Sequence, residues 1–193
     1  MIIGQFKKLL YPFLLLSFVV FLTLNWVLPK EIGGWLSCIG YTSVVMTVIG
    51  LVYNSFLWRF NPWERTPRLA KRYDATIKYC YKGTLGEKVA TVSIEQTLLS
   101  VSVEIETDKI KSRTVCSSLV SENEQFILYY TYDTEPRGVG NDDNPKARGT
   151  CRIPIEPRNL IFVKAQETLK GTYWTTRKTT GDIVLEENKE KSK

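Results

Sequence analysis

Two long uncharged runs near the N-terminus limit the folds open to this chain more than any other feature. Neither residues 9–28 (LLYPFLLLSFVVFLTLNWVL) nor residues 35–58 (WLSCIGYTSVVMTVIGLVYNSFLW) contain a charged residue. An α-helix needs about 20 mostly apolar residues to cross the hydrocarbon core of a bilayer. We therefore expect residues 1–60 to form a transmembrane hairpin of two helices.

The first run could also be the apolar core of a secretory signal peptide, because Lys7 and Lys8 precede it. Such a core has about 7–15 residues and is followed by a cleavage site of small residues. This run is longer, and the bulky segment NWVLPKEIGGW ends it. A membrane span is therefore the better interpretation.

The basic residues predict on which side of the membrane the ends of the chain lie. Lys7 and Lys8 precede the first run. The basic residues after the second run are Arg59, Arg65, Arg68, Lys71 and Arg72. Since Lys and Arg are enriched on the cytoplasmic side of spans, we expect both termini in the cytoplasm. This cluster also supplies much of the formal charge of +6, which favours lipid headgroups as partners over DNA or RNA.

The C-terminal two thirds of the chain consist of segments in which apolar and polar residues alternate. In residues 98–107 (LLSVSVEIET), Leu99, Val101, Val103 and Ile105 alternate with serine and glutamate. A period of two with one apolar face predicts a half-buried β-strand. Eight segments have this character: residues 74–83, 88–96, 98–107, 112–122, 124–134, 147–156, 170–178 and 181–187.

These eight strands predict an all-β cytoplasmic domain over residues 70–188. A linker at residues 61–69 precedes it, and a charged tail at residues 189–193 follows it. Mostly short connections favour an antiparallel meander, which removes its free edges by closing into an up-and-down β-barrel. An eight-stranded barrel is filled by side chains or holds one small ligand. A β-sandwich is the main alternative.

The sequence offers no catalytic or metal-binding pattern. It contains no histidine, and its four cysteines form no CxxC pair. It also lacks a GxSxG nucleophile motif and a glycine-rich phosphate loop. We therefore expect a protein that is not an enzyme and that needs no metal or cofactor.

Residues 169–188 (LKGTYWTTRKTTGDIVLEEN) predict a hairpin rich in threonine and aromatic residues. If Thr179 and Thr180 form a two-residue turn, Trp174 and Thr176 point inward with Ile183 and Leu185. In that register Tyr173, Thr175 and Arg177 point outward. A longer turn would shift the register and exchange the two faces.

Two interpretations of this hairpin remain open from the residues alone. In the first, Trp174 is part of the core, and Arg177 and Asp182 form a surface cross-strand pair. In the second, the hairpin binds a ligand, because aromatic rings stack on bases and arginine pairs with phosphate.

The two N-terminal spans, the basic linker and the strand-only domain ending in LKGTYWTTRKTTGDIVL together resemble a known family. It is the two-transmembrane, β-strand-rich effector family of bacterial CBASS anti-phage immunity. The resemblance covers the whole chain. It implies a multi-pass protein of the bacterial inner membrane whose barrel senses a cyclic dinucleotide from a partner cyclase. It also implies homo-oligomeric assembly, loss of membrane integrity and death of the infected cell.

Side-chain chemistry indicates which residues could bind this ligand. They are Tyr173, Thr175 and Arg177 on the hairpin, and Arg152 and Tyr130 on strands that could neighbour it. The alternative is a membrane-tethered, lipocalin-like barrel that binds a lipid or another apolar ligand and does not permeabilise the membrane. An apolar interior with few polar groups would favour that alternative.

The second run carries a stripe of small and polar residues at helical spacing. Its members are Gly40, Ser43, Thr47, Gly50 and Asn54. Small residues let helices approach closely in lipid, and polar residues hydrogen-bond across the contact. The stripe either packs against the first span of the same chain, or forms a contact between chains or a wet path through the membrane.

Overall fold

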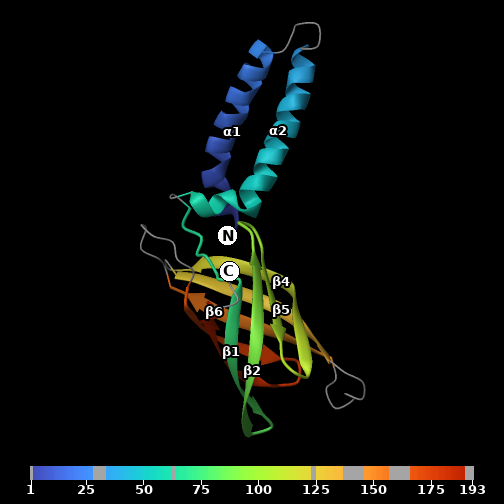
Figure 1. Ribbon diagram of the computed structural model, residues 1–193, viewed down its shortest axis with the longest axis vertical. Coiled ribbons are helices and arrows are strands. Elements are labelled where there is room, and N and C mark those ends of the chain that lie inside the picture. Colours follow the sequence, from blue (N-terminus) through green and yellow to red (C-terminus); the bar gives the residue numbers. More distant parts are fainter. Residues whose placement is uncertain are drawn as a thin grey trace. The chain divides into compact units, whose positions relative to one another are not determined.

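The computed structural model describes residues 2–27, 34–61, 64–122, 125–136, 146–156 and 166–189. The chain divides into two compact units, Met1–Asn61 and Pro62–Lys193. Helices form the first unit and strands form the second (Figure 1).

The first unit contains two long helices, α1 (Ile2–Val27) and α2 (Trp35–Ser55), and a short 3₁₀ helix, η1 (Leu57–Phe60). Within them, Leu10–Val27 and Trp35–Ser55 are long and apolar enough to cross a membrane, judged by length and composition. The sequence predicts that the second span ends at Trp58. In the structure α2 ends earlier, at Ser55, and Trp58 lies in the short helix η1.

The second unit is built from eight strands. They are β1 (Arg72–Tyr81), β2 (Thr84–Gln96), β3 (Val101–Glu106), β4 (Ile110–Glu122), β5 (Gln125–Pro136), β6 (Ala147–Ile155), β7 (Thr168–Thr175) and β8 (Thr180–Glu187). Each strand pairs antiparallel with the next, and β8 pairs with β1, which closes the barrel. The predicted eight-stranded up-and-down barrel is confirmed, and the sandwich alternative is wrong.

The barrel interior is filled by one cluster of buried side chains. Val101, Val103 and Ile105 of β3 belong to it, as their alternation predicted. Leu99 does not, although the same pattern included it. It lies in the turn before β3 and is 61% exposed, because Thr97 and Ser100 close that turn by hydrogen bonds to each other and so end the strand pairing.

The linker closes one end of the barrel. The side-chain amide of Gln96 accepts a hydrogen bond from Leu69 N at 2.9 Å and donates one to Pro67 O at 2.8 Å. The hydroxyl of Tyr73 accepts one from Ala70 N at 2.8 Å. We call this the linker end. The opposite, turn end carries the β1–β2, β3–β4 and β7–β8 turns.

The register of the β7–β8 hairpin differs from the sequence prediction. Trp174 pairs with Thr180, so the turn spans residues 175–179 instead of two threonines. Lys178 adopts a φ of 60° there, and its N–H donates to Thr175 O at 3.0 Å. The longer turn exchanges the faces, so Tyr173 packs against the core and Trp174 is 46% exposed.

The same register separates the expected surface pair. Asp182 pairs with Thr172 on β7 and with Lys78 on β1. Arg177 lies in the turn, outside the ladder, so the predicted Arg177–Asp182 pair is wrong.

Candidate ligand-binding site

A layer of tyrosines lines the barrel interior toward the turn end. The ladders place Tyr130, Cys151 and Tyr173 side by side on β5, β6 and β7. Tyr132 follows on β5, with its ring centroid 5.8 Å from that of Tyr130. Tyr79 of β1 pairs with Gly181 of β8, which pairs with Tyr173. An otherwise apolar interior therefore becomes polar toward this end.

Glycines on adjacent strands make room for these rings. A Cβ at Gly149 would lie 2.4 Å from the Tyr132 ring, and one at Gly86 would lie 2.4 Å from the Tyr79 ring. A Cβ at Gly181 would lie 2.0 Å from the backbone oxygen of Lys78. The rings thus cover strand positions without side chains, a known way to support glycine in sheets.

Burial keeps these groups protonated. It raises the pKa of Tyr130 and Tyr132 well above the ordinary value. It also raises the pKa of Tyr173 to about 12 and that of the Cys151 thiol to about 11. At neutral pH the layer therefore presents neutral hydroxyls, which both donate and accept hydrogen bonds.

Arg177 lies in the β7–β8 turn, four positions after Tyr173 of this layer. Its Nε is shielded from solvent and has no hydrogen-bond partner within the residues that the structure describes. A shielded donor without a partner costs free energy, about 1–3 kcal/mol for a typical group. Such a donor marks a position where a ligand oxygen would be bound favourably.

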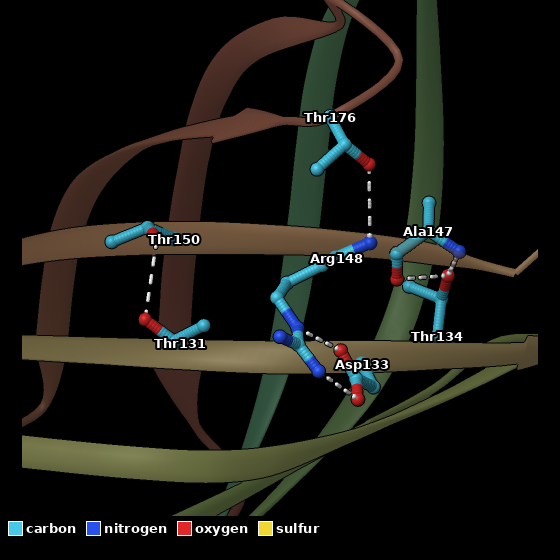
Figure 2. A network of polar contacts seen from close by, with 7 residues as sticks. All are labelled: Thr131, Asp133, Thr134, Ala147, Arg148, Thr150 and Thr176. Carbon is cyan, nitrogen blue, oxygen red and sulfur yellow. Dashed lines mark hydrogen bonds and ion pairs between the residues drawn. The ribbon is translucent and has the colours of Figure 1, made fainter.

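The turn that carries Arg177 is fixed to β6. Thr176 N donates to Arg148 O at 2.8 Å. In addition, Arg148 N donates to Thr176 Oγ1 at 3.3 Å (Figure 2). The Arg148 guanidinium in turn binds both carboxylate oxygens of Asp133, at 2.7 and 3.0 Å. This pair lowers the pKa of Asp133. The charge of Arg148 is therefore already neutralised, whereas Arg177 has no carboxylate partner within the described residues.

The structure places four of the five proposed ligand residues in two groups and the fifth, Arg152, apart from them. Tyr130 and Tyr173 lie in the tyrosine layer, and Thr175 and Arg177 lie where β7 meets its turn. Arg152 lies on the outer face, where its Nε donates to Tyr129 Oη at 3.2 Å. Tyr130 is 2% exposed, so it packs within the layer and presents almost no surface to a ligand.

Two tyrosines of the layer, Tyr132 and Tyr79, are not among the residues predicted from the sequence. The alternation that places Tyr130 on the inner face of β5 places Tyr132 there too. The interpretation of Trp174 as a core residue depends on a two-residue turn, and the structure has a longer one.

An open groove of about 740 Å³ lies across β2, β1, β8 and β7. Alternation along the strands places the side chains of Leu85, Trp174, Lys78, Glu87 and Asp182 on its outer surface. Two carboxylates against one ammonium make it unfavourable for an anion. The lining of the groove also includes Tyr79 and Tyr173 of the tyrosine layer, so the two candidate sites adjoin each other, and the groove carries the acidic side chains.

The proposed stripe on α2 is mostly outside the buried face of that helix. The buried side chains are Cys38, Thr42 and Met46, whereas Gly40, Ser43 and Thr47 are exposed within this unit. The hydroxyls of Ser43 and Thr47 donate to carbonyls of their own helix, at 2.9 and 2.8 Å. Their polarity is thus satisfied without a second helix.

The remaining two stripe residues lie closer to the rest of the first unit. A Cβ at Gly50 would lie 3.7 Å from the ring of Phe13 on α1, and Asn54 is half-buried. The stripe is therefore divided between packing within the hairpin and an open face.

Comparison with known proteins gives two matches. The family model described as "Cap15, cyclic dinucleotide receptor domain" matches residues 64–187, which include all eight strands. A curated relative from Staphylococcus schleiferi, CD-NTase-associated protein 15, is 35% identical over 159 residues. The match covers 81% of this chain and 82% of the relative.

Proposed function

The chain belongs to the Cap15 cyclic dinucleotide receptor family, and on this premise we propose that its barrel binds a cyclic dinucleotide made by a partner cyclase. The observation that carries the proposal is the coincidence of the receptor-domain match, residues 64–187, with the closed barrel. Family membership confirms the resemblance to CBASS effectors.

We place the ligand at the turn end, against Tyr173, Tyr132, Thr175 and Arg177. The linker closes the other end through Gln96, and the outer groove has the wrong charge for two phosphodiesters. At the turn end, tyrosine rings can stack on bases, and the Arg177 guanidinium can pair with a phosphate. The shielded, unpartnered Nε of Arg177 supports this choice.

Ligand binding is proposed to act through the membrane. In this account α1 and α2 cross the bacterial inner membrane, and liganded copies gather into a homo-oligomer that disrupts it and kills the infected cell. The exposed residues Gly40, Ser43 and Thr47 of α2 are the proposed contact between chains, because the buried face of that helix lies elsewhere. Both ends of the chain then lie in the cytoplasm.

The lipid-binding alternative gains no support from the barrel. A lipid carrier needs an empty apolar cavity, but buried side chains fill this interior as one contiguous cluster. No observation favours a second function over nucleotide sensing.

A leakage assay tests the proposal. The full chain is reconstituted into vesicles of anionic bacterial lipids filled with a self-quenched dye, and a panel of cyclic dinucleotides is added outside. We expect one nucleotide to release dye from vesicles with outward-facing barrels and linear dinucleotides to release none. If no cyclic dinucleotide releases dye although the inserted protein binds one, the effector part of the proposal fails and the receptor part stands.

A further inference from the structure

Strand β2 extends beyond its neighbour β3 and so has a free edge. It pairs with β1 from Thr84 to Ser93, but with β3 only from Thr91 to Gln96. On the β3 side, the main-chain groups of residues 84–90 have no strand partner within the described part of the chain. Unpaired strand edges are templates for pairing with another chain.

The free edge also carries the most exposed large apolar side chains among the described residues of the barrel. Leu85 is 82% exposed and Val89 is 73% exposed. Both point to the outer face, on which the exposed ring of Trp174 also lies. Apolar side chains gathered on one exposed surface indicate an interaction site more strongly than scattered ones do.

We propose that the free edge of β2 pairs antiparallel with the same edge of a second copy of this chain, around a two-fold axis at Glu87. The edge is self-complementary in this register, which uses all of residues 84–90. Leu85 then lies opposite Val89 of the second copy, and Thr84 lies opposite Ala90. In an isologous pairing of this kind the contact between Leu85 and Val89 occurs twice, once on each side of the two-fold axis.

Charge opposes the pairing at its centre. Glu87 meets Glu87 of the second copy, and like charges directly opposite one another in a sheet are destabilising. Lys78, opposite Glu87 on β1, offsets this only in part. A seven-residue edge is also small beside the roughly 800 Å² per partner of a stable interface. Dilute copies therefore stay apart, and copies crowded on one membrane pair through their high effective concentration.

This inference relies on the proposed function only for the event that brings the copies together, which is nucleotide binding. High density in the membrane replaces that event in the test, so no nucleotide is added. The full chain, with Cys80 and Cys116 replaced by serine, is reconstituted into vesicles at high density and oxidised. Glu87→Cys should form a disulfide-linked dimer, because opposite residues have Cα atoms about 4.5–5.5 Å apart. Leu85→Cys and Val89→Cys should each form little dimer alone and cross-link when the two variants are mixed.

The control is Glu95→Cys on the same strand and face, where β3 occupies the edge; it should not cross-link. Equal cross-linking at all positions would indicate random collision and overturn the proposal. No cross-linking, or cross-linking only at Lys88→Cys, would also overturn it.

A second variant tests the charge. At fixed density, measured by energy transfer between labelled copies, Glu87→Gln should raise the paired fraction about 1.5- to 5-fold, the range expected for one like-charge cross-strand pair. Glu95→Gln should leave it unchanged. An unchanged or lower fraction for Glu87→Gln would show that the two edges do not meet at Glu87. Neither failure would bear on nucleotide binding.

Discussion

Arg177 is the proposed phosphate partner at the turn end, and its shielded Nε has no hydrogen-bond partner among the described residues. Three other cations are already paired: Arg148 binds Asp133, and Lys111 and Arg113 bind Glu104. Exposed pairs of this kind contribute little stability, but they remove those cations as phosphate partners. Lys88 of β2 instead lies over the Tyr79 ring, with its ammonium 5.4 Å from the ring centroid. The contrast with these paired cations is the reason to test Arg177 first.

Replacing Arg177 should therefore weaken nucleotide binding. Because a hydrogen bond to a charged group contributes about 1.5–3 kcal/mol, we expect Arg177→Ala to raise the Kd about ten- to a hundredfold, measured by titration of the full chain in lipid nanodiscs. Lys170→Ala, on the exposed face of β7, is the control and should change the Kd by less than about twofold. An unchanged Kd for Arg177→Ala would remove Arg177 from the site.

The buried thiol and hydroxyls predict a pH dependence of stability. Cys151 and Tyr173 have a raised pKa, about 11 and about 12, against ordinary values of 9.0 and 10.0. Below pH 9 both groups are neutral in the folded and unfolded states. Above it the unfolded chain loses protons first, so stability falls as pH rises. We expect Cys151 alone to account for about 2 kcal/mol by pH 11.

Thermal unfolding between pH 8 and pH 11 measures this effect. The Tm should fall steadily above pH 9, and Cys151→Ala should make the decline shallower. A Tm that stays constant up to pH 10.5 would show that the thiol and the tyrosines are not buried as described.

At the scale of the elements, alternation predicted the strands and the turns limited the prediction. A period of two is a property of the strand itself. The alternation in Val101–Glu106 and in the corresponding segments therefore predicted all eight strands. Turn length depends on backbone conformations that threonine and lysine do not encode strongly, such as the positive φ of Lys178. A turn of the wrong length in the prediction therefore places Trp174 in the core, whereas the structure places it on the surface.

The same hairpin contains a glycine that the fold requires. A Cβ at Gly181 would meet the backbone oxygen of Lys78 at 2.0 Å, and backbone cannot move aside without breaking the β1–β8 ladder. We expect Gly181→Ala to destabilise the barrel by at least about 2 kcal/mol, in the upper range for overpacking, in denaturant titrations of the full chain.

Gly86→Ala is the matched comparison. Its Cβ would meet only the end of the Tyr79 ring, which can rotate away, so we expect a smaller loss of stability. If Gly181→Ala were as mild as Gly86→Ala, β1 and β8 would not approach as closely as the register implies.

At the scale of the whole molecule, composition predicted more than any local motif did. The uncharged runs and the alternating segments each extend over many residues, so a single residue that breaks the pattern does not change the prediction. The helical hairpin and the barrel could therefore be predicted from the sequence. The proposed ligand site could not, because it combines side chains from β5, β7 and a turn, which only the pairing of both strands with β6 brings together. Tyr132 and Arg177 are 45 positions apart by residue number, and no periodicity connects them.

The membrane unit yields a prediction about permeabilisation. Ser43→Leu with Thr47→Leu replaces two exposed small residues of α2 with bulky ones. We expect normal insertion and nucleotide binding, but at least a tenfold slower ligand-triggered dye release, because the helices of different chains can no longer approach closely. Val44→Leu with Val48→Leu, on neighbouring exposed positions, should release dye normally. Equal release by both double variants would exclude the stripe as the contact between chains.

Direct binding of a cyclic dinucleotide to the full chain tests the central claim. The chain is held in lipid nanodiscs, its β-rich fold is checked by circular dichroism, and radiolabelled cyclic dinucleotides are titrated one at a time. We predict saturable binding of at least one of them with a Kd below tens of micromolar, competed by the unlabelled nucleotide and not by linear dinucleotides. A folded chain that binds none of them at 100 µM, about the affinity of non-specific contacts, would contradict the assignment of this barrel as a cyclic dinucleotide receptor.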